Sequence, residues 1–416
     1  MVHRIVQAGG LHMRKVTIVF FDAGGGHRNA AEALKNSLES QAQPWSVRLL
    51  NLQEQLDSID VIRRVTGIRI QDGYNLILRK GWTRPTPQLL VLLRGLVRLY
   101  HARIIAALEK YWRQNSADLV LSVIPLFNRA LAESINRATP QTAFATLLTD
   151  LADCPPHFWI EPESEFLICG TERAEQQARE MGHSPYRVFR TSGMILKAKF
   201  YELPAIDVEM ERYRLGLVPS LPTGIVMFGG HGAPVMREIA KRLDAGKQPV
   251  QLIMICGHHD NLRADLQQMQ TKAPMVVEGF TSNVANYMSM ADFFIGKPGP
   301  GSISEALQFH LPVIVERNQR TMPQERYNTD WVTEKRLGIV LRRFAEVAQG
   351  VEQLLQPETF AELRSNTRAY SNRALFEVPA ILDEVLARHV PYSVPVSPAF
   401  TDSEAIGRGA AWAGST

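Results

Sequence analysis

A glycine run between an apolar stretch and a helical pattern is the first place in this sequence where chemistry is expected. The stretch 15–22 (KVTIVFFD) is followed by three glycines, at positions 24 to 26, and by His27. Glycine lets a backbone approach a ligand closely, and the free amides of a helix start favour an anion. The helix dipole lowers the pKa of a histidine placed there, so His27 is expected to be neutral and able to accept a proton. The alternative is a structural glycine turn with an incidental surface histidine.

A second candidate site lies in the run 297–305 (KPGPGSISE), which follows the apolar stretch 292–296 and opens a helical pattern. Backbone amides and the Ser302 hydroxyl of such a loop can hold a diphosphate without a metal ion. Glu305 follows about one helical turn into that pattern, within reach of the paired hydroxyls of a ribose. An ordinary Pro/Gly turn, with Ser302 as a helix cap, is the competing interpretation.

Two other positions combine polar side chains with the end of an apolar stretch. Gln324 and Glu325 place an amide beside a carboxylate, which suits hydrogen bonding to sugar hydroxyls, although a solvated helix start has the same look. Asp150 ends the stretch 143–149 and is expected to point into the cleft of a doubly wound sheet. It would orient His27 or the acceptor there, or only cap a turn.

The stretch 63–113 is basic and rich in leucine. It holds eleven Arg and Lys residues against two acidic ones, and residues 1–150 carry a net charge of +8, whereas the whole chain carries +4. A basic amphipathic helix can lie in an anionic membrane interface, and a core helix with a solvated basic face has the same pattern. The candidate contacts to a membrane or a lipid acceptor are Gly25, Gly26, Arg84, Arg94, Arg98, Phe158 and Trp159, the last two being either an apolar lip or core residues.

Several classes of function find no support in the composition. Cys154, Cys169 and Cys256 lie far apart without CxxC pairing, so neither a disulfide framework nor a zinc site is expected, and the chain is predicted to be cytosolic. No apolar run reaches the roughly 20 residues that span a bilayer. No recognition-helix motif indicates a nucleic-acid partner.

The elements that must position these residues form two series of strand, glycine-containing loop and helix. The predicted strands of the first series are 15–22, 47–52, 119–124, 143–149 and 166–169, and those of the second series are 224–230, 250–256, 275–280, 292–296 and 312–316. This alternation is typical of α/β domains with doubly wound parallel sheets. The predicted segments are an N-terminal extension (1–12, with Met1 or Met13 as the start), a first domain (13–202), a second domain (203–370), a terminal helix that crosses back (371–390) and a disordered tail (391–416).

Taken together, the motifs resemble the family of monogalactosyldiacylglycerol synthases and processive diacylglycerol glucosyltransferases. The first-domain signature is the glycine run with His27 and the helix start 30–34, followed by Thr149 to Leu151 and by 157–159. In the second domain, 278–280, 298–306 and the Gln324–Asn328 segment match the donor site of glycosyltransferase family 28. The resemblance covers roughly residues 14–385.

The resemblance implies a GT-B fold, in which two Rossmann-like domains face a cleft, and inverting chemistry with a UDP-sugar donor. His27 would be the base that deprotonates the acceptor, with Asp150 as a second catalytic residue. The donor site it implies consists of Gly229, Gly230, Phe280 at the uracil, Gly299, Gly301, Ser302 and Ile303 at the diphosphate, Glu305 at the ribose, and Gln324, Glu325 and Asn328 at the hexose. No metal or other cofactor is expected.

This chain departs from the family pattern at three places. His231 stands where an acidic residue is usual, Gly257 is followed by two histidines instead of a basic residue and Asn, and Ser302 replaces Thr. With these departures the loop still fits a donor site, but the sequence does not decide which sugar is bound.

The predicted function is therefore inverting transfer of galactose or glucose from a UDP-hexose to a lipid, 1,2-diacylglycerol first. The enzyme would act as a peripheral protein on the inner face of the cell membrane, held through its first domain. Alternatives are transfer to a polyprenyl-linked or soluble glycan, a sugar-nucleotide epimerase, or a non-catalytic nucleotide-sugar-binding protein. The sequence decides neither the hexose, the exact acceptor, the processivity nor the oligomeric state.

Overall fold

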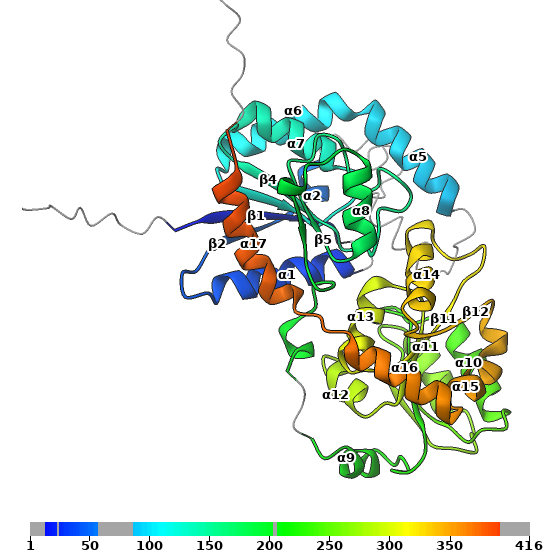
Figure 1. The fold of residues 1–416 in the computed structure, drawn as a ribbon. Coiled ribbons are helices and arrows are strands. Elements are labelled where there is room, and N and C mark those ends of the chain that lie inside the picture. The colour runs from blue at the N-terminus through cyan, green and yellow to red at the C-terminus, as the bar shows by residue number, and fades with distance from the viewer. Residues whose placement is uncertain (1–12, 23–24, 57–85, 203–205, 392–416) are drawn as a thin grey trace, which may run out of the picture.

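The structure is a computed structural model that describes residues 13–22, 25–56, 86–202 and 206–391. Two α/β domains follow one another along the chain (Figure 1), each built on a six-stranded parallel sheet. The fold predicted from the sequence, two doubly wound domains, is confirmed.

The first sheet has the strand order β2-β1-β3-β4-β5-β6. Its three middle strands β3, β4 and β5 are buried along their whole length, as expected of parallel strands covered by helices on both faces. The strands are β1 (Lys15–Phe20), β2 (Ser46–Asn51), β3 (Leu119–Ser122), β4 (Ala143–Leu147), β5 (Phe166–Cys169) and β6 (Val188–Arg190). The helices of this domain are α1 (Gly26–Glu39), α2 (Leu52–Leu56), α5 (Thr86–Leu99), α6 (His101–Gln114), α7 (Asn128–Ala138) and α8 (Glu172–Glu180).

The second sheet has the order β12-β11-β10-β7-β8-β9. Its strands are β7 (Thr223–Met227), β8 (Gln251–Ile255), β9 (Met275–Glu278), β10 (Phe293–Gly296), β11 (Val313–Glu316) and β12 (Gly338–Leu341). The helices of this half are α9 (Val208–Arg214), α10 (Val235–Asp244), α11 (Asp260–Gln267), α12 (Val284–Ser289), α13 (Pro300–Gln308), α14 (Arg326–Glu334), α15 (Val347–Leu354) and α16 (Pro357–Ala369).

Ten of the twelve strands coincide with the apolar stretches predicted from the sequence, and two edge strands were not predicted. These two, β6 and β12, are three and four residues long, and each is only partly buried. A short edge strand lacks the continuous apolar run of a central strand, so it leaves little pattern in the sequence.

The last helix, α17 (Ala374–Arg388), returns to the first domain and lies beside α1 (Figure 1). Its buried residues, among them Leu375, Leu382 and Val385, belong to the same apolar core as β1 and α1. At its end, the Arg388 guanidinium donates to the carbonyl of Tyr186 at 2.7 Å. The C-terminal helix thus ties the two halves of the chain together.

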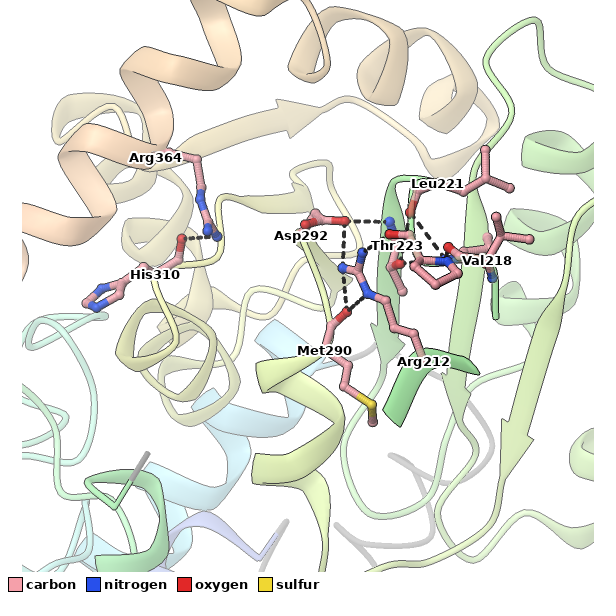
Figure 2. Close-up of polar contacts among 10 residues, drawn as sticks. Arg212, Val218, Leu221, Thr223, Met290, Asp292, His310 and Arg364 are labelled. Carbon is pink, nitrogen blue, oxygen red and sulfur yellow. Dashed lines mark hydrogen bonds and ion pairs between the residues drawn. The ribbon is translucent and has the colours of Figure 1, made fainter. Parts of the chain in front are cut away.

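A buried arginine fixes the start of the second domain (Figure 2). Arg212 on α9 is 8% exposed and donates to the carbonyls of Met290 and Pro219 and to a carboxylate oxygen of Asp292 at 2.9 Å. The same Asp292 oxygen accepts the backbone amide of Thr223 at 2.8 Å. The segment after residue 205 is therefore part of the second domain.

Candidate active site

His27 lies at the switch point of the first sheet, where β1 has β2 on one side and β3 on the other. Ligands of doubly wound sheets bind at the carboxyl ends of the strands at such a point. Gly25 caps α1 with a φ of 82°, a left-handed conformation that favours glycine. The Nδ1 atom of His27 lies 3.1 Å from the Thr149 hydroxyl, just after β4, and the imidazole also hydrogen-bonds the backbone of Val123 after β3.

Burial lowers the pKa of His27 from 6.5 to about 4, against the smaller upward effect of the hydrogen bond to Val123. The imidazole is therefore neutral at pH 7. The side chain stays partly exposed, so a ligand in the cleft can reach it. A neutral, accessible imidazole is the form that a general base requires.

Asp150 makes no hydrogen bond to His27, so the first of the roles considered for it, direct orientation of the histidine, is not supported by the structure. Its Oδ2 atom accepts the indole N–H of Trp159 at 2.8 Å. The Trp159 ring connects the two residues, because it donates to Asp150 and its centroid lies 5.9 Å from that of His27. Burial raises the pKa of Asp150 to about 7, which the Trp159 hydrogen bond opposes.

The switch point of the second sheet lies between β7 and β10, which are neighbours although they are not consecutive. The loop after β7 contains Gly229 and Gly230, and the loop after β10 begins at Lys297. The loop after β8 packs on the first of these, since a Cβ atom on Gly257 would lie 2.3 Å from the Gly230 carbonyl oxygen. Three backbone loops thus meet at the carboxyl edge of this sheet.

The predicted diphosphate loop starts α13, with Gly299 as its N-cap. Gly301 is exposed and Ser302 half-buried in the first turn, where a helix leaves amides without intrahelical partners. Two residues predicted as ligands, Ile303 and Asn328, have other roles in the structure.

Ile303 is fully buried and its amide donates to the Gly299 carbonyl at 3.1 Å. It therefore stabilises the loop and is not a ligand of the diphosphate.

Asn328 was predicted at the hexose. Its side chain is fully buried, and the side-chain amide donates to the carbonyl of Pro298 at 2.7 Å. Asn328 therefore holds the 297–301 loop in place, instead of lying open to a hexose.

An ion pair between Lys297 and Glu325 lies at the start of the predicted diphosphate loop. The Nζ atom of Lys297 lies 3.1 Å from an oxygen of Glu325, and Glu325 is 6% exposed. Gln324, beside it, is half-buried. Lys297 opens the run 297–305, but the sequence analysis predicted no role for it. The signal that could have indicated a role is its position directly after a buried strand, at the start of a glycine loop.

Glu305 lies on α13, half-buried, with its pKa raised to about 7 by burial. The ammonium groups of Lys199 and Lys197 act in the opposite direction, so these two side chains from the interdomain segment lie near it. Lys199 also donates to the carbonyl of Ser282 at 2.5 Å. The predicted ribose site is thus bordered by the segment that joins the domains.

Phe280, predicted at the base of the nucleotide, is 66% exposed at the end of β9. The imidazole of His258 stacks on it, with ring centroids 4.0 Å apart and planes inclined by 14°. An exposed aromatic ring is suited to stacking with a planar base. His258 was noted in the sequence only as a departure from the family pattern.

The two halves of the site face each other across the domain boundary. The Cys154 thiol of the first domain donates to the carbonyl of Pro323 at 3.2 Å, directly before Gln324. The charges of Glu325 and Lys297 act on the pKa of Asp150, which requires these groups to lie near one another. Residues of the predicted acceptor and donor sites therefore meet in one cleft.

The expected membrane contacts are only partly accessible. Phe158 and Trp159 are 6% and 0% exposed and pack in an apolar cluster, so the expectation of an apolar lip at these side chains is wrong. The Asp153 carboxylate accepts the backbone amides of both, which fixes their loop inside the domain. Arg98 is exposed and Arg94 half-buried on α5, and Arg84 lies outside the described residues.

Among the described residues, no group of three or more His, Cys, Asp or Glu side chains is arranged to hold a metal ion. None of the helices in the described part of the chain combines the length and apolar character needed to cross a membrane.

Residues 224–384 match the model of the glycosyltransferase family 28 C-terminal domain. Among curated proteins, the chain is 27% identical over 399 residues to the probable monogalactosyldiacylglycerol synthase 3, chloroplastic, of Oryza sativa subsp. japonica, covering 92% of this chain and 76% of the relative. It is 25% identical over 412 residues to monogalactosyldiacylglycerol synthase 2, chloroplastic, of Arabidopsis thaliana, covering 93% of this chain and 84% of that one.

Solved structures with a similar fold include MurG of Acinetobacter baumannii, with a TM-score of 0.59 at 11% identity, over 89% of this chain and 99% of that one. A UDP-glucosyltransferase from Polygonum tinctorium has a TM-score of 0.58 at 15% identity, over 91% of this chain and 99% of that one. At these identities, the two structures speak for the fold alone.

Proposed function

We propose that the chain, a UDP-sugar-dependent glycosyltransferase of the GT-B fold whose residues 224–384 match the family 28 C-terminal domain, transfers galactose from UDP-galactose to 1,2-diacylglycerol. The similarity to monogalactosyldiacylglycerol synthases along more than nine-tenths of the chain supports this donor and this acceptor. Diacylglycerol resides in membranes, so the reaction would take place at a membrane surface.

The observation that carries the proposal is the neutral His27 on one domain, facing glycine loops and an ion pair on the other. In the reaction, the acceptor hydroxyl attacks the anomeric carbon while the imidazole of His27 takes its proton. The bond from that carbon to the UDP oxygen breaks, and the configuration inverts because the two oxygens lie on opposite sides. Backbone amides at the start of α13 stabilise the charge on the departing diphosphate.

Replacement of His27 tests the proposal. We expect His27→Ala to lower turnover by about 10²- to 10⁴-fold, the usual contribution of a general base, while UDP binding is kept. The assay is UDP release in liposomes that contain diacylglycerol. The variant His101→Gln on α6 serves as the control, since this half-buried histidine pairs with Glu133 on α7 and with none of the predicted site residues.

Two results would contradict the assignment. Near wild-type turnover in His27→Ala would remove the histidine from the role of base. Turnover by the wild type with UDP-glucose but not UDP-galactose, or with a polyprenyl-linked acceptor but not diacylglycerol, would replace the proposed substrates.

A further inference from the structure

We propose that Lys297 is the cation that binds the donor's diphosphate, and that it is held ready for this by its ion pair with Glu325. The inference rests on the proposed function, since it concerns the UDP moiety of the donor. It gives a role to Lys297, the first residue of the run 297–305, for which the sequence motif predicted none.

The position of Lys297 is the first argument. It directly follows β10, and β10 pairs with β7 at the switch point of the second sheet, where doubly wound folds bind nucleotides. Its side chain runs between two glycine loops: a Cβ atom on Gly229 would lie 3.8 Å from Lys297 Cε, and one on Gly299 would lie 3.3 Å from it. Any larger side chain on Gly299 would press on the lysine. Lys297 thus lies against both loops that line the predicted diphosphate site.

The charge of the pair is the second argument. Glu325 is almost wholly buried, and a buried carboxylate is costly unless a cation or hydrogen-bond donors compensate it. The Lys297 ammonium supplies that compensation at 3.1 Å, yet 37% of its own side chain remains exposed. An ammonium group has three donors, so Nζ can contact a phosphate oxygen while it keeps Glu325.

A cation at this point would favour the reaction. Departure of UDP places additional negative charge on the diphosphate, and backbone amides supply only partial positive charges. The Lys297 side chain, which lies against Gly299 at the start of α13, would add a full positive charge there.

The ion pair also gives the two members different tasks. While Nζ contacts Glu325 on one side and the phosphates on the other, the carboxylate lone pairs that the ammonium does not use can accept hydrogen bonds from the hexose hydroxyls. The intact pair would thereby provide a phosphate contact and a sugar contact side by side. The competing explanation is that Lys297 only neutralises Glu325 and touches no ligand.

Binding measurements with three nucleotide probes separate these explanations. We expect calorimetry on Lys297→Gln to show about a 10- to 100-fold loss of UDP affinity, the range of one charge-assisted hydrogen bond, with uridine affinity unchanged and UMP between them. Lys297→Arg should keep most of the UDP affinity because it keeps the charge. Lys241→Gln, an exposed position on α10, is the matched control and should bind UDP like the wild type.

The double variant Lys297→Gln with Glu325→Gln decides whether the loss arises indirectly. If the lysine binds phosphate, UDP affinity stays low in the double variant. Recovery of UDP affinity, or an unchanged ratio of UDP to uridine affinity in Lys297→Gln, would overturn the inference and leave the proposed function standing. A wild-type protein that binds no UDP would overturn both.

Discussion

At the scale of single residues, the two sides of the cleft differ in charge. Burial lowers the pKa of His27 to about 4 and raises that of Asp150 to about 7, so each group is pushed toward its neutral form. The charges that act on Asp150 include Lys297 and Glu325 of the other domain and Asp153 of its own domain. A neutral base on the first domain thus lies opposite an ion pair of the predicted donor site.

The raised pKa of Asp150 has a consequence for stability. Because the carboxyl titrates near 3.8 when unfolded and near 7 when folded, its contribution to stability is full at low pH and is lost as the pH rises through 7. Asp150→Asn does not titrate. We therefore expect its stability relative to the wild type to increase from pH 5 to pH 8, measured as urea midpoints at both values. Parallel behaviour of the two proteins would show that Asp150 is ionised in the folded state at pH 5.

At the scale of elements, the functional loops follow the carboxyl ends of the parallel strands. Polar contacts at the opposite ends of the strands fix the strands in position. Arg212 is such an anchor, because it joins α9 to the backbone before β10 through Met290 and Asp292. The β10 strand then leads directly to Lys297. The anchor acts at the start of the strand and the chemistry is expected at its end.

Loss of this anchor should destabilise the second domain. We expect Arg212→Leu to lower its free energy of unfolding by about 3–5 kcal/mol, since Asp292 loses its cation and the carbonyls of Met290 and Pro219 lose a donor. Thermal and urea unfolding, read for each domain separately, measure the change. The matched control is Arg214→Leu on the same helix, an exposed ion pair worth about 0–1 kcal/mol. Equal effects of the two substitutions would contradict the anchoring role.

At the scale of the whole molecule, the described part of the basic stretch 63–113 forms α5 and α6 of the first domain. The end of α5 exposes Arg98 together with Leu99, which is 75% exposed, a combination of charge and apolar side chain suited to a membrane interface. The second domain carries the donor loops. This division would let the first domain contact the lipid while UDP-sugar enters from the aqueous side.

Sedimentation with anionic vesicles tests this division. We expect Arg98→Glu to weaken vesicle binding by about tenfold or more, since each basic residue near an anionic surface contributes about 1 kcal/mol and a reversal counts twice. Binding should also fall with increasing salt. Lys241→Glu on the second domain is the control of equal charge change. If both reversals weaken binding equally, the attraction is due to net charge and not to α5.

The sequence by itself determined the two doubly wound domains and the main motifs, because both are local properties. A buried parallel strand is a short apolar run, and a ligand loop is a run of glycine beside a strand end, so His27, Ser302, Glu305 and Glu325 could be proposed as site residues from their neighbours in the chain. The edge strands β6 and β12 were not predicted because they are short and only partly buried.

Only the tertiary structure decided which of these residues meet. His27 and Thr149 are 122 residues apart, and Lys297 and Glu325 are 28 apart, so their contacts depend on how the sheets place their loops. The same packing buried Trp159, for which the sequence had left core and apolar lip as alternatives, and Asn328, which had been predicted at the hexose. Burial and ion pairing are properties of residues brought together by folding, and local sequence patterns do not encode them.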